Sequence, residues 1–321
     1  MFVHIAGTGS YLPRRIVTND EIAQSLDTSD EWIFSHTGIH ARHVVSDDEQ
    51  TSTMAYEASV KALERANVKP EELGAIIVAS STGDYYGYPS VACLLQGRLG
   101  CKRVGAFDVQ AACSGFLYSL RIAYGLMQTD PRPVLVVGAE TMTRTLDWKD
   151  RNVCILFGDG AGAAVLKADD QPGGILEMII GADGTANPPV LQHTGGTLLV
   201  PGDPPEGKLR MNGRAVFNFA VKVFDEMIGE MLSRSGKTYD DLKLVVSHQA
   251  NARIIEAVAR RVGQPMGKFF LNMENVGNTS AASVPIALDE AVQRGAIQKG
   301  DLIASVAFGA GLAYAGALIR W

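Results

Sequence analysis

Short, mostly apolar runs alternate along the first half of the chain with longer segments in which apolar residues recur every three or four positions. The runs at 74–80, 104–109 and 134–137 have the length of strands. Residues 55–66 and 114–127 have the apolar spacing of helices. Strands that are apolar on both faces are typical of sheets covered by helices on both sides. The pattern therefore predicts a layered α/β fold.

The second half of the chain resembles the first. Residues 157–166 (FGDGAGAAVL) are similar to residues 308–318 (FGAGLAYAGAL). We therefore predict a duplicated domain whose copies comprise residues 1–170 and 171–321, with a turn-rich junction between them.

One segment has the length of a membrane span, because residues 302–319 form a run of 18 positions without a charge. Its glycines, and Asp159 in the corresponding segment of the first half, favour bent strands in a soluble core instead. The N-terminus also lacks the basic and apolar regions of a signal peptide. We therefore expect a cytoplasmic protein that does not enter a membrane.

Composition narrows the classes of function. With 46% hydrophobic and 20% charged residues, the chain of 321 residues is too apolar to be disordered. Its formal net charge of −6 provides no general attraction for nucleic acid. The 4 cysteines form neither a disulfide framework nor a C-x-x-C pair, so neither zinc nor another metal is expected.

Cys113 is the cysteine with the most informative position, since it lies where the run 104–109 ends and the helix 114–127 begins. Unpaired N–H groups and the positive end of a helix dipole favour a thiolate, which is the form that attacks carbonyl carbon. The alternative is a small buried hydrophobic residue, because free cysteine is often buried.

Two polar residues of the second half are further candidates. His248 follows an apolar run at 244–246, and ligands of α/β proteins bind at strand ends, although a lone histidine there is more often structural. Asn278 precedes small residues and a predicted helix through 286–292, so it is either functional or an N-cap. The segment 309–311 is either a bend or a source of backbone donors.

Together these features resemble the thiolase-like condensing enzymes, and among them the β-ketoacyl-acyl-carrier-protein synthases III, over essentially the whole chain. The motifs that carry the resemblance are GTGSYLP (7–13), TSDEWI (28–33), ACSG (112–115), FGDGAG (157–162), HQAN (248–251) and GNTSAAS (277–283).

The resemblance implies two pseudo-symmetric βαβαβαββ halves packed as α/β/α/β/α layers, with the nucleophile in the first half. It also implies the initiating step of type II fatty acid synthesis. In that step an acyl-CoA primer, most simply acetyl-CoA, condenses with malonyl-acyl carrier protein to give acetoacetyl-acyl carrier protein, CoA and CO2. Acyl-CoA is then a substrate, and no cofactor is needed.

The family's catalytic set maps by resemblance onto Cys113, His248 and Asn278. Cys113 takes the acyl group as a thioester. A neutral His248 and Asn278 then donate hydrogen bonds to the enolate oxygen that decarboxylation creates. The backbone N–H groups of Cys113 and Ala310 form the oxyanion hole, and the family usually has glycine at the position of Ala310.

The CoA site is implied in the same way. Trp32 and Arg151 correspond to the pair that sandwiches the adenine, and Asn251 reaches the pantetheine arm. His36 stands where relatives usually have arginine. Because histidine is mostly neutral at pH 7, we expect a weaker or more pH-dependent affinity for CoA.

The resemblance also implies a homodimer, in which Tyr88 crosses the interface and closes the acyl pocket of the partner. Further candidates for the lining of the pocket are Met142, Phe157, Met211 and Phe217.

Carrier-protein binding is implied for the stretch that follows His248. If 250–262 is helical, Ile255 and Val258 fall on an apolar face, with Arg253 and Arg260 opposite. The candidate contacts are Gln249, Ala250, Asn251, Ala252, Arg253, Arg260 and Arg261. A solvated helix face is the alternative.

Three other functions stay open. A relative within the same fold could use branched or longer primers or an acceptor of secondary metabolism. A Cys–His–Asn hydrolase would use water as the acceptor, and a binding protein could retain the fold without catalysis.

Overall fold

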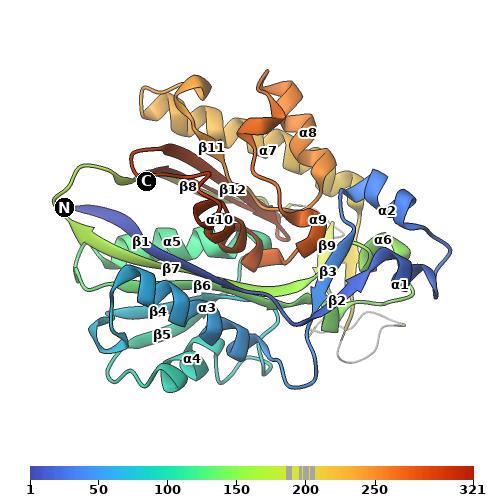
Figure 1. Cartoon of the computed structure of the whole chain (residues 1–321), viewed down its shortest axis with the longest axis horizontal. Helices are drawn as coiled ribbons and strands as arrows, with labels where there is room; N and C mark the ends of the chain where they lie inside the picture. Colours follow the sequence, from blue (N-terminus) through green and yellow to red (C-terminus); the bar gives the residue numbers. More distant parts are fainter. Residues whose placement is uncertain (186–189, 195–196, 198–201, 203–206) are drawn as a thin grey trace.

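The computed structural model describes residues 1–185, 190–194, 197, 202 and 207–321. Figure 1 shows two main sheets that lie one above the other, with helices between them and outside them. The strands of the first sheet are, in spatial order, β1 (Phe2–Tyr11), β7 (Asp159–Asp169), β6 (Val134–Thr141), β4 (Ala75–Ala79) and β5 (Gly105–Val109). Those of the second are β11 (Leu244–Val245), β12 (Leu302–Gly309), β13 (Ala313–Arg320) and β8 (Gly174–Ala182).

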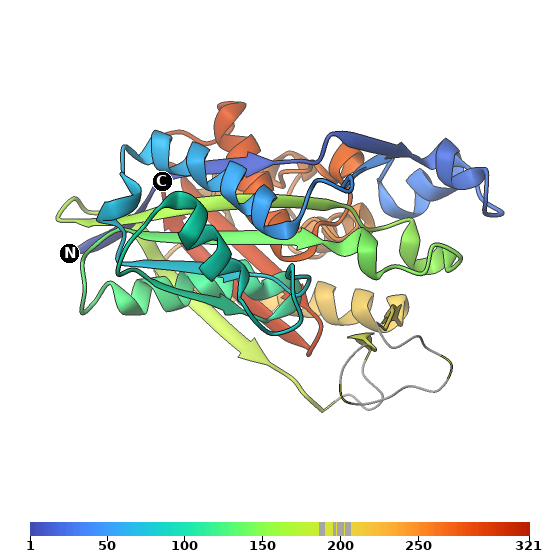
Figure 2. The same cartoon turned by 90° about the horizontal axis from the view of Figure 1, so that it is seen from below.

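Three pairs of helices complete the layers. The outer face of the first sheet carries α3 (Thr51–Ala66) and α4 (Val91–Leu99), and the outer face of the second carries α7 (Gly213–Arg234) and α8 (Ala252–Arg261). Between the sheets lie α5 (Gly115–Leu126) and α10 (Ser283–Gln293). The order is α/β/α/β/α, which confirms the predicted fold class, and Figure 2 shows the same layers from below.

The continuous apolar runs form strands because both faces of each sheet are covered. On β4, Ile76 and Val78 belong to the outer core under α3 and α4, whereas Ile77 belongs to the core between the sheets. Successive side chains of a strand point to opposite faces, so a strand with two covered faces needs no polar positions. The same rule explains β12, whose residues divide between the middle core and the core under α7 and α8.

The two sheets have corresponding strand orders. β1, β7, β6 and β4 of the first sheet have the same sequence of neighbours as β8, β13, β12 and β11 of the second. β5 corresponds to a single bridge, in which Phe269 pairs in parallel with Val245. The similarity of the sheets agrees with a duplication, and the division of the chain near residue 170 stays a prediction.

The uncharged run at 302–319 forms the antiparallel pair β12 and β13, as the sequence predicts. Among the described residues, no helix combines the length and apolar character needed to cross a bilayer. The predicted helix at 114–127 begins later than expected, because a 3₁₀ turn, η2 (Ala112–Ser114), precedes α5.

The remaining elements of the described structure are short. They are β2 (Arg15–Thr18), β3 (Ala41–Val44), β9 (Leu191–His193), β10 (Leu209–Met211), α1 (Asn19–Ala23), α2 (Asp30–Thr37), α6 (Arg151–Cys154), α9 (Met273–Val276) and the 3₁₀ turns η1 (Pro70–Glu72), η3 (Met142–Thr145), η4 (Tyr239–Asp241), η5 (Met266–Lys268) and η6 (Ser280–Ala282).

Candidate active site

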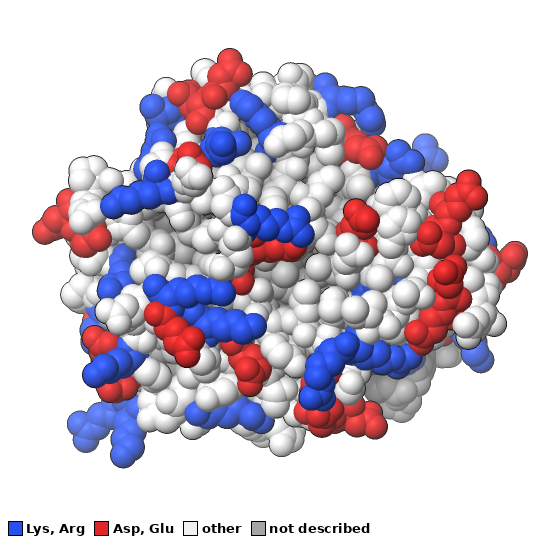
Figure 3. All heavy atoms as spheres, in the orientation of Figure 1, with Lys and Arg blue, Asp and Glu red and all other residues white. Residues whose placement is uncertain are grey.

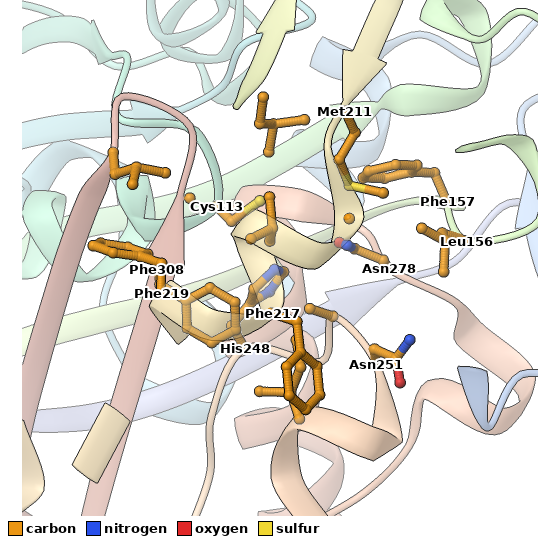
Figure 4. Close-up of a pocket in the computed structure, with 17 residues that line it drawn as sticks. Cys113, Leu156, Phe157, Met211, Phe217, Phe219, His248, Asn251, Asn278 and Phe308 are labelled. Atoms are coloured by element: carbon orange, nitrogen blue, oxygen red, sulfur yellow. The ribbon is translucent and has the colours of Figure 1, made fainter. Parts of the chain in front are cut away.

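A cavity opens where α5 and α10 begin, and Cys113, His248 and Asn278 all line it. Figure 4 shows their side chains converging on the same space from three different segments. Most of the other lining residues are apolar: Leu156, Phe157, Leu191, Met211, Val216, Phe217, Phe219, Ala250, Ile254, Phe308 and Leu312. A mostly apolar pocket with a few convergent polar groups is the usual form of a small-molecule site.

The backbone holds Cys113 in a constrained position. Ala112 has φ 46°, in the left-handed region that non-glycine residues rarely adopt. A Cβ at Gly309 would lie 2.7 Å from the Cys113 nitrogen, so only glycine allows the end of β12 to approach so closely. Backbone strain of this kind is concentrated at functional sites.

The surroundings of Cys113 oppose the thiolate that the helix terminus favours. The residue is only 5% exposed, and burial raises the pKa of its thiol to about 12. The thiol donates a hydrogen bond to Ser280 Oγ at 3.5 Å. Burial therefore favours the thiol over the thiolate at Cys113, and a role as nucleophile would need a proton acceptor nearby.

His248 follows β11 and is held by its neighbours in one tautomer. Ser283 Oγ lies 2.6 Å from His248 Nδ1 and also accepts the Gln249 N–H at 3.0 Å. We assign the Ser283 hydroxyl as the donor to Nδ1, because this direction gives the hydroxyl an acceptor as well as a donor, and the proton of the imidazole then lies on Nε2. Burial lowers the pKa of His248 to about 3, so the ring is neutral at physiological pH, as the sequence analysis expects.

Asn278 is oriented by the turn that follows it. Its Oδ1 accepts the Ser280 N–H at 2.9 Å, and its own backbone N–H donates to Leu156 O at 2.8 Å. This contact of Oδ1 resembles that of an N-cap, which is one of the two roles that the sequence left open for Asn278. Because Oδ1 is occupied in this way, the amide NH2 group is the part of Asn278 that can donate into the cavity.

Two residues beside the cysteine were not predicted. Glu140, at the end of β6, is buried completely, and its Oε1 accepts the Ser280 hydroxyl at 3.1 Å. Ser280 has φ 50°, a second non-glycine residue in the left-handed region. Ser280 belongs to the GNTSAAS motif, but the sequence gives no signal for Glu140, because only the fold brings β6 next to η6.

The predicted CoA residues lie together at the rim. The Arg151 guanidinium lies 4.7 Å from the centre of the Trp32 ring, and the His36 ring stacks on Trp32 at 4.2 Å. Asn251 Nδ2 donates to His36 O at 3.1 Å, so its amide turns away from Cys113, as Figure 4 also shows. A carbon plane between Trp32 and Arg151 needs about 7 Å, twice a van der Waals contact. Arg151 must therefore move to admit an adenine.

The remaining predicted residues fall into three groups. Phe157, Met211 and Phe217 line the cavity. Ala310 and Met142 are not among its described lining residues: Gly309 lines it instead of Ala310, and Met142 is buried in the core under α7 and α8. Tyr88 is 87% exposed on a loop, so a role in the pocket of a partner stays a prediction.

The predicted carrier-protein contacts differ in their accessibility. Gln249 is only 1% exposed, and its side chain donates to two backbone carbonyls; Ala250 lines the cavity. Neither can form part of an outer docking surface, since burial removes both from solvent. The predicted helix corresponds to α8, in which Ile255 and Val258 are buried and Arg260 is exposed.

Family models agree with this arrangement. Residues 107–184 match the model described as 3-oxoacyl-[acyl-carrier-protein] synthase III, and residues 232–321 match the model of its C-terminal part.

Similar proteins cover the whole chain. A β-ketoacyl-[acyl-carrier-protein] synthase III from Xanthomonas euvesicatoria is 49% identical over 100% of this chain and 99% of its own. The crystal structure of a 3-oxoacyl-[acyl-carrier-protein] synthase III from Aquifex aeolicus has a TM-score of 0.93 at 42% identity and covers 99% of this chain and 100% of its own. A priming β-ketosynthase from a polyketide biosynthetic pathway also has a TM-score of 0.93, at 39% identity, covering 99% of this chain and 96% of its own.

Proposed function

Because the chain belongs to the β-ketoacyl-[acyl-carrier-protein] synthase III family, an acyl-transferring family of condensing enzymes, we propose that it performs the initiating condensation of fatty acid synthesis in the cytoplasm. An acyl-CoA primer, most simply acetyl-CoA, and malonyl-acyl carrier protein are the proposed substrates. The products are acetoacetyl-acyl carrier protein, CoA and CO2. The observation that carries the proposal is the convergence of Cys113, His248 and Asn278 on one apolar cavity.

In the first half-reaction, Cys113 attacks the thioester carbonyl of the acyl-CoA. The Cys113 sulfur bonds to the acyl carbon, and the bond from that carbon to the CoA sulfur breaks. The negative charge on the carbonyl oxygen needs backbone donors, and the N–H of Cys113 is one of them. The close approach of Gly309 supports the end of β12 as the source of the second donor, for which the N–H of Ala310 remains our candidate.

In the second half-reaction, malonyl-acyl carrier protein loses CO2, and the resulting enolate carbon attacks the acyl-Cys113 carbonyl. No base is needed at carbon, since decarboxylation supplies the electron pair. The enolate oxygen needs hydrogen-bond donors in a dry site. His248 can donate through Nε2–H and Asn278 through its amide, because Ser283 and Ser280 occupy the other polar atoms of the two side chains.

The experiment that tests the proposal combines two measurements. Intact-mass spectrometry after incubation with acetyl-CoA should show one acetyl group on the protein. Adding malonyl-acyl carrier protein should then remove that group and release acetoacetyl-acyl carrier protein. Steady release of acetate without any need for malonyl-acyl carrier protein would instead indicate a hydrolase.

His36 provides a prediction about CoA affinity. Its ring stacks on Trp32 and is fixed by its Nδ1, which lies 2.6 Å from Trp32 O, so it cannot extend toward a phosphate as an arginine can. We expect His36→Arg to lower the KM for acetyl-CoA several-fold at pH 7.5 and low salt, with kcat nearly unchanged. His36→Gln is the matched neutral control. An unchanged KM for acetyl-CoA in His36→Arg would contradict the prediction that an arginine at this position strengthens CoA binding.

A docking surface for the carrier protein is proposed at α8. Figure 3 shows acidic and basic side chains interspersed on the face of the molecule that Figure 1 presents, so attraction of an acidic partner needs a local basic group. Arg253 already donates to Ser35 O and pairs with Glu256, and Arg261 pairs with Asp225 at 2.7 Å. Arg260 has no ion pair among the described residues, which makes it the clearest candidate.

We therefore expect Arg260→Glu to raise the KM for malonyl-acyl carrier protein several-fold, with acylation by acetyl-CoA unchanged. Added salt should reduce the difference between this variant and the wild type, because the attraction is screened. Lys299→Glu is the matched control: it makes the same change of charge before β12, at the end of the strand away from the cavity. If both variants behave alike, α8 is not the docking surface.

A homodimer is proposed on the basis of exposed apolar surface. Tyr85, Tyr86 and Tyr88 are 59%, 77% and 87% exposed on one loop. β5 is an edge strand of the first sheet, and its Phe107 is 37% exposed. Exposed apolar residues grouped beside an open sheet edge are typical of an interface. Sedimentation of the wild type and of Tyr88→Ser tests the assembly.

A second candidate differs only in the primer. The likeness to a priming β-ketosynthase of a polyketide pathway supports keeping the alternative of branched or longer primers, or of an acceptor of secondary metabolism. The apolar lining of the cavity by phenylalanine and methionine is compatible with either primer. A panel of straight and branched acyl-CoAs at saturating malonyl-acyl carrier protein distinguishes the two.

A further inference from the structure

A buried carboxyl group lies one side chain away from the reactive sulfur. Cys113 donates from its thiol to Ser280 Oγ at 3.5 Å, and Ser280 donates from its hydroxyl to Glu140 Oε1 at 3.1 Å. All three residues are buried, with Cys113 5%, Ser280 2% and Glu140 0% exposed. The donors point in one direction, from the sulfur to the carboxylate.

The surroundings of Glu140 are built to hold the ionised form. Its Oε2 accepts the Thr82 hydroxyl, the Ser81 N–H at 3.1 Å and the Ser80 hydroxyl at 3.5 Å. Burial nevertheless raises the pKa of Glu140 to about 7, where a group exchanges a proton most effectively at neutral pH. The titratable group nearest to Glu140 is Cys113, which contacts it through Ser280 of η6. The groups that Glu140 meets after the end of β4 are uncharged: two hydroxyls and a backbone N–H.

The condensation mechanism does not use this carboxyl group, yet activation of Cys113 lacks a proton acceptor. His248 Nδ1 is occupied by Ser283, and its other ring nitrogen carries a proton, so a neutral His248 has no free acceptor. A negative charge on Glu140 opposes a negative charge on the sulfur. Transfer of the proton from Cys113 to Glu140 forms the thiolate. The same transfer neutralises the carboxylate whose negative charge opposes that thiolate.

We propose that Glu140 takes the proton of Cys113 through the Ser280 hydroxyl, holds it while the acyl-enzyme exists, and returns it when the thiolate leaves. The proposal rests on the proposed function for its role in catalysis. Ser280 touches the reacting sulfur, and Glu140 acts through Ser280.

The atoms and charges balance over both half-reactions. In the first, the thiol proton passes to Ser280 as the Ser280 proton passes to Glu140, the bond from sulfur to the acyl carbon forms, and CoA leaves as a thiolate that takes a proton from water. In the second, CO2 leaves the malonyl group, the new carbon–carbon bond forms, and the Cys113 thiolate departs. The proton on Glu140 then returns through Ser280, so the thiol and the carboxylate are restored.

The test begins with a reaction that does not depend on acyl-CoA. The rate of alkylation of Cys113 by iodoacetamide is measured against pH by peptide mass mapping, with the exposed Cys93 of the same chain as internal reference. In the wild type we expect the rate to rise through an inflection near pH 7. In Ser280→Ala and Glu140→Gln we expect that inflection to vanish, with a loss of about 10²-fold at pH 7.5. Glu140→Asp should restore part of the rate.

Ser280→Ala protects the test against misfolding, because it leaves the contacts of Glu140 with Ser81 and Thr82 in place. Ser119→Ala is the matched control, a buried serine of α5 for which the described residues provide no hydrogen-bond partner. An unchanged pH profile in both Ser280→Ala and Glu140→Gln would overturn the proposal, as would a wild-type profile without an inflection near pH 7.

A second readout follows the stored proton. Acylation by acetyl-CoA in weak buffer at pH 7.5 should take up protons from the solvent in the wild type, because CoA leaves as a thiolate, in proportion to the fraction of Glu140 that is ionised before the step. Ser280→Ala should take up none. No uptake in the wild type would contradict storage on Glu140. Normal alkylation without any acylation would count against the proposed function alone, which keeps the two failures distinguishable.

Discussion

Cys113→Ala is expected to abolish acetylation by acetyl-CoA and to lower condensation by at least about 10³-fold, since no other described residue that lines the cavity carries a thiol, hydroxyl or amine. The variant should still decarboxylate malonyl-acyl carrier protein, because the donors on His248 and Asn278 remain in place. Intact-mass spectrometry measures the first effect, and release of CO2 measures the second.

The matched control is Cys93→Ala. Cys93 is exposed on α4, and its removal should leave both half-reactions unchanged. An acetyl adduct that persists in Cys113→Ala and disappears in Cys93→Ala would overturn the assignment of the nucleophile.

The layers of the fold could be predicted because their cause is local. A run such as 74–80 is apolar at every position, and the structure divides its side chains between two covered faces. The glycines of the uncharged run 302–319, and Asp159 in the corresponding segment of the first half, separated this run from a membrane span. Asp159 begins β7, which is the counterpart of β13 in the other sheet. Element ends were less predictable: the strained turn at Ala112 delays the start of α5.

Contacts across the chain explain what the sequence could not predict. The thiolate expected for Cys113 followed from its place before a helix, but burial by distant segments has the opposite effect on the pKa of the thiol and raises it. Glu140 is separated from Ser280 by 140 positions and carries no motif of its own. Gln249 belongs to the HQAN motif, for which the resemblance implied contact with the carrier protein. Its side chain is buried instead, because its amide donates to Phe270 O and Ser247 O.

The two half-reactions depend on His248 and Asn278 to different degrees. His248→Ala and Asn278→Ala should each lower condensation by about 10²–10³-fold, which is the usual cost of removing one donor to a developing oxyanion. Acylation of Cys113 should fall far less in both variants, because the proton acceptor that we propose for the thiol lies on the side of Ser280 and Glu140. Single-turnover acetylation and malonyl decarboxylation, measured separately, distinguish the two effects.

His248→Gln and Ser283→Ala refine the comparison. An amide at 248 still presents an N–H group, so His248→Gln should recover part of the decarboxylation that His248→Ala loses. Ser283→Ala leaves the imidazole in place but removes the hydroxyl that fixes its proton on Nε2. Condensation should therefore fall in Ser283→Ala while acetylation stays nearly unchanged. If His248→Ala and Asn278→Ala instead lose both half-reactions equally, His248 and Asn278 also take part in activating the thiol, and the roles assigned to them here are wrong.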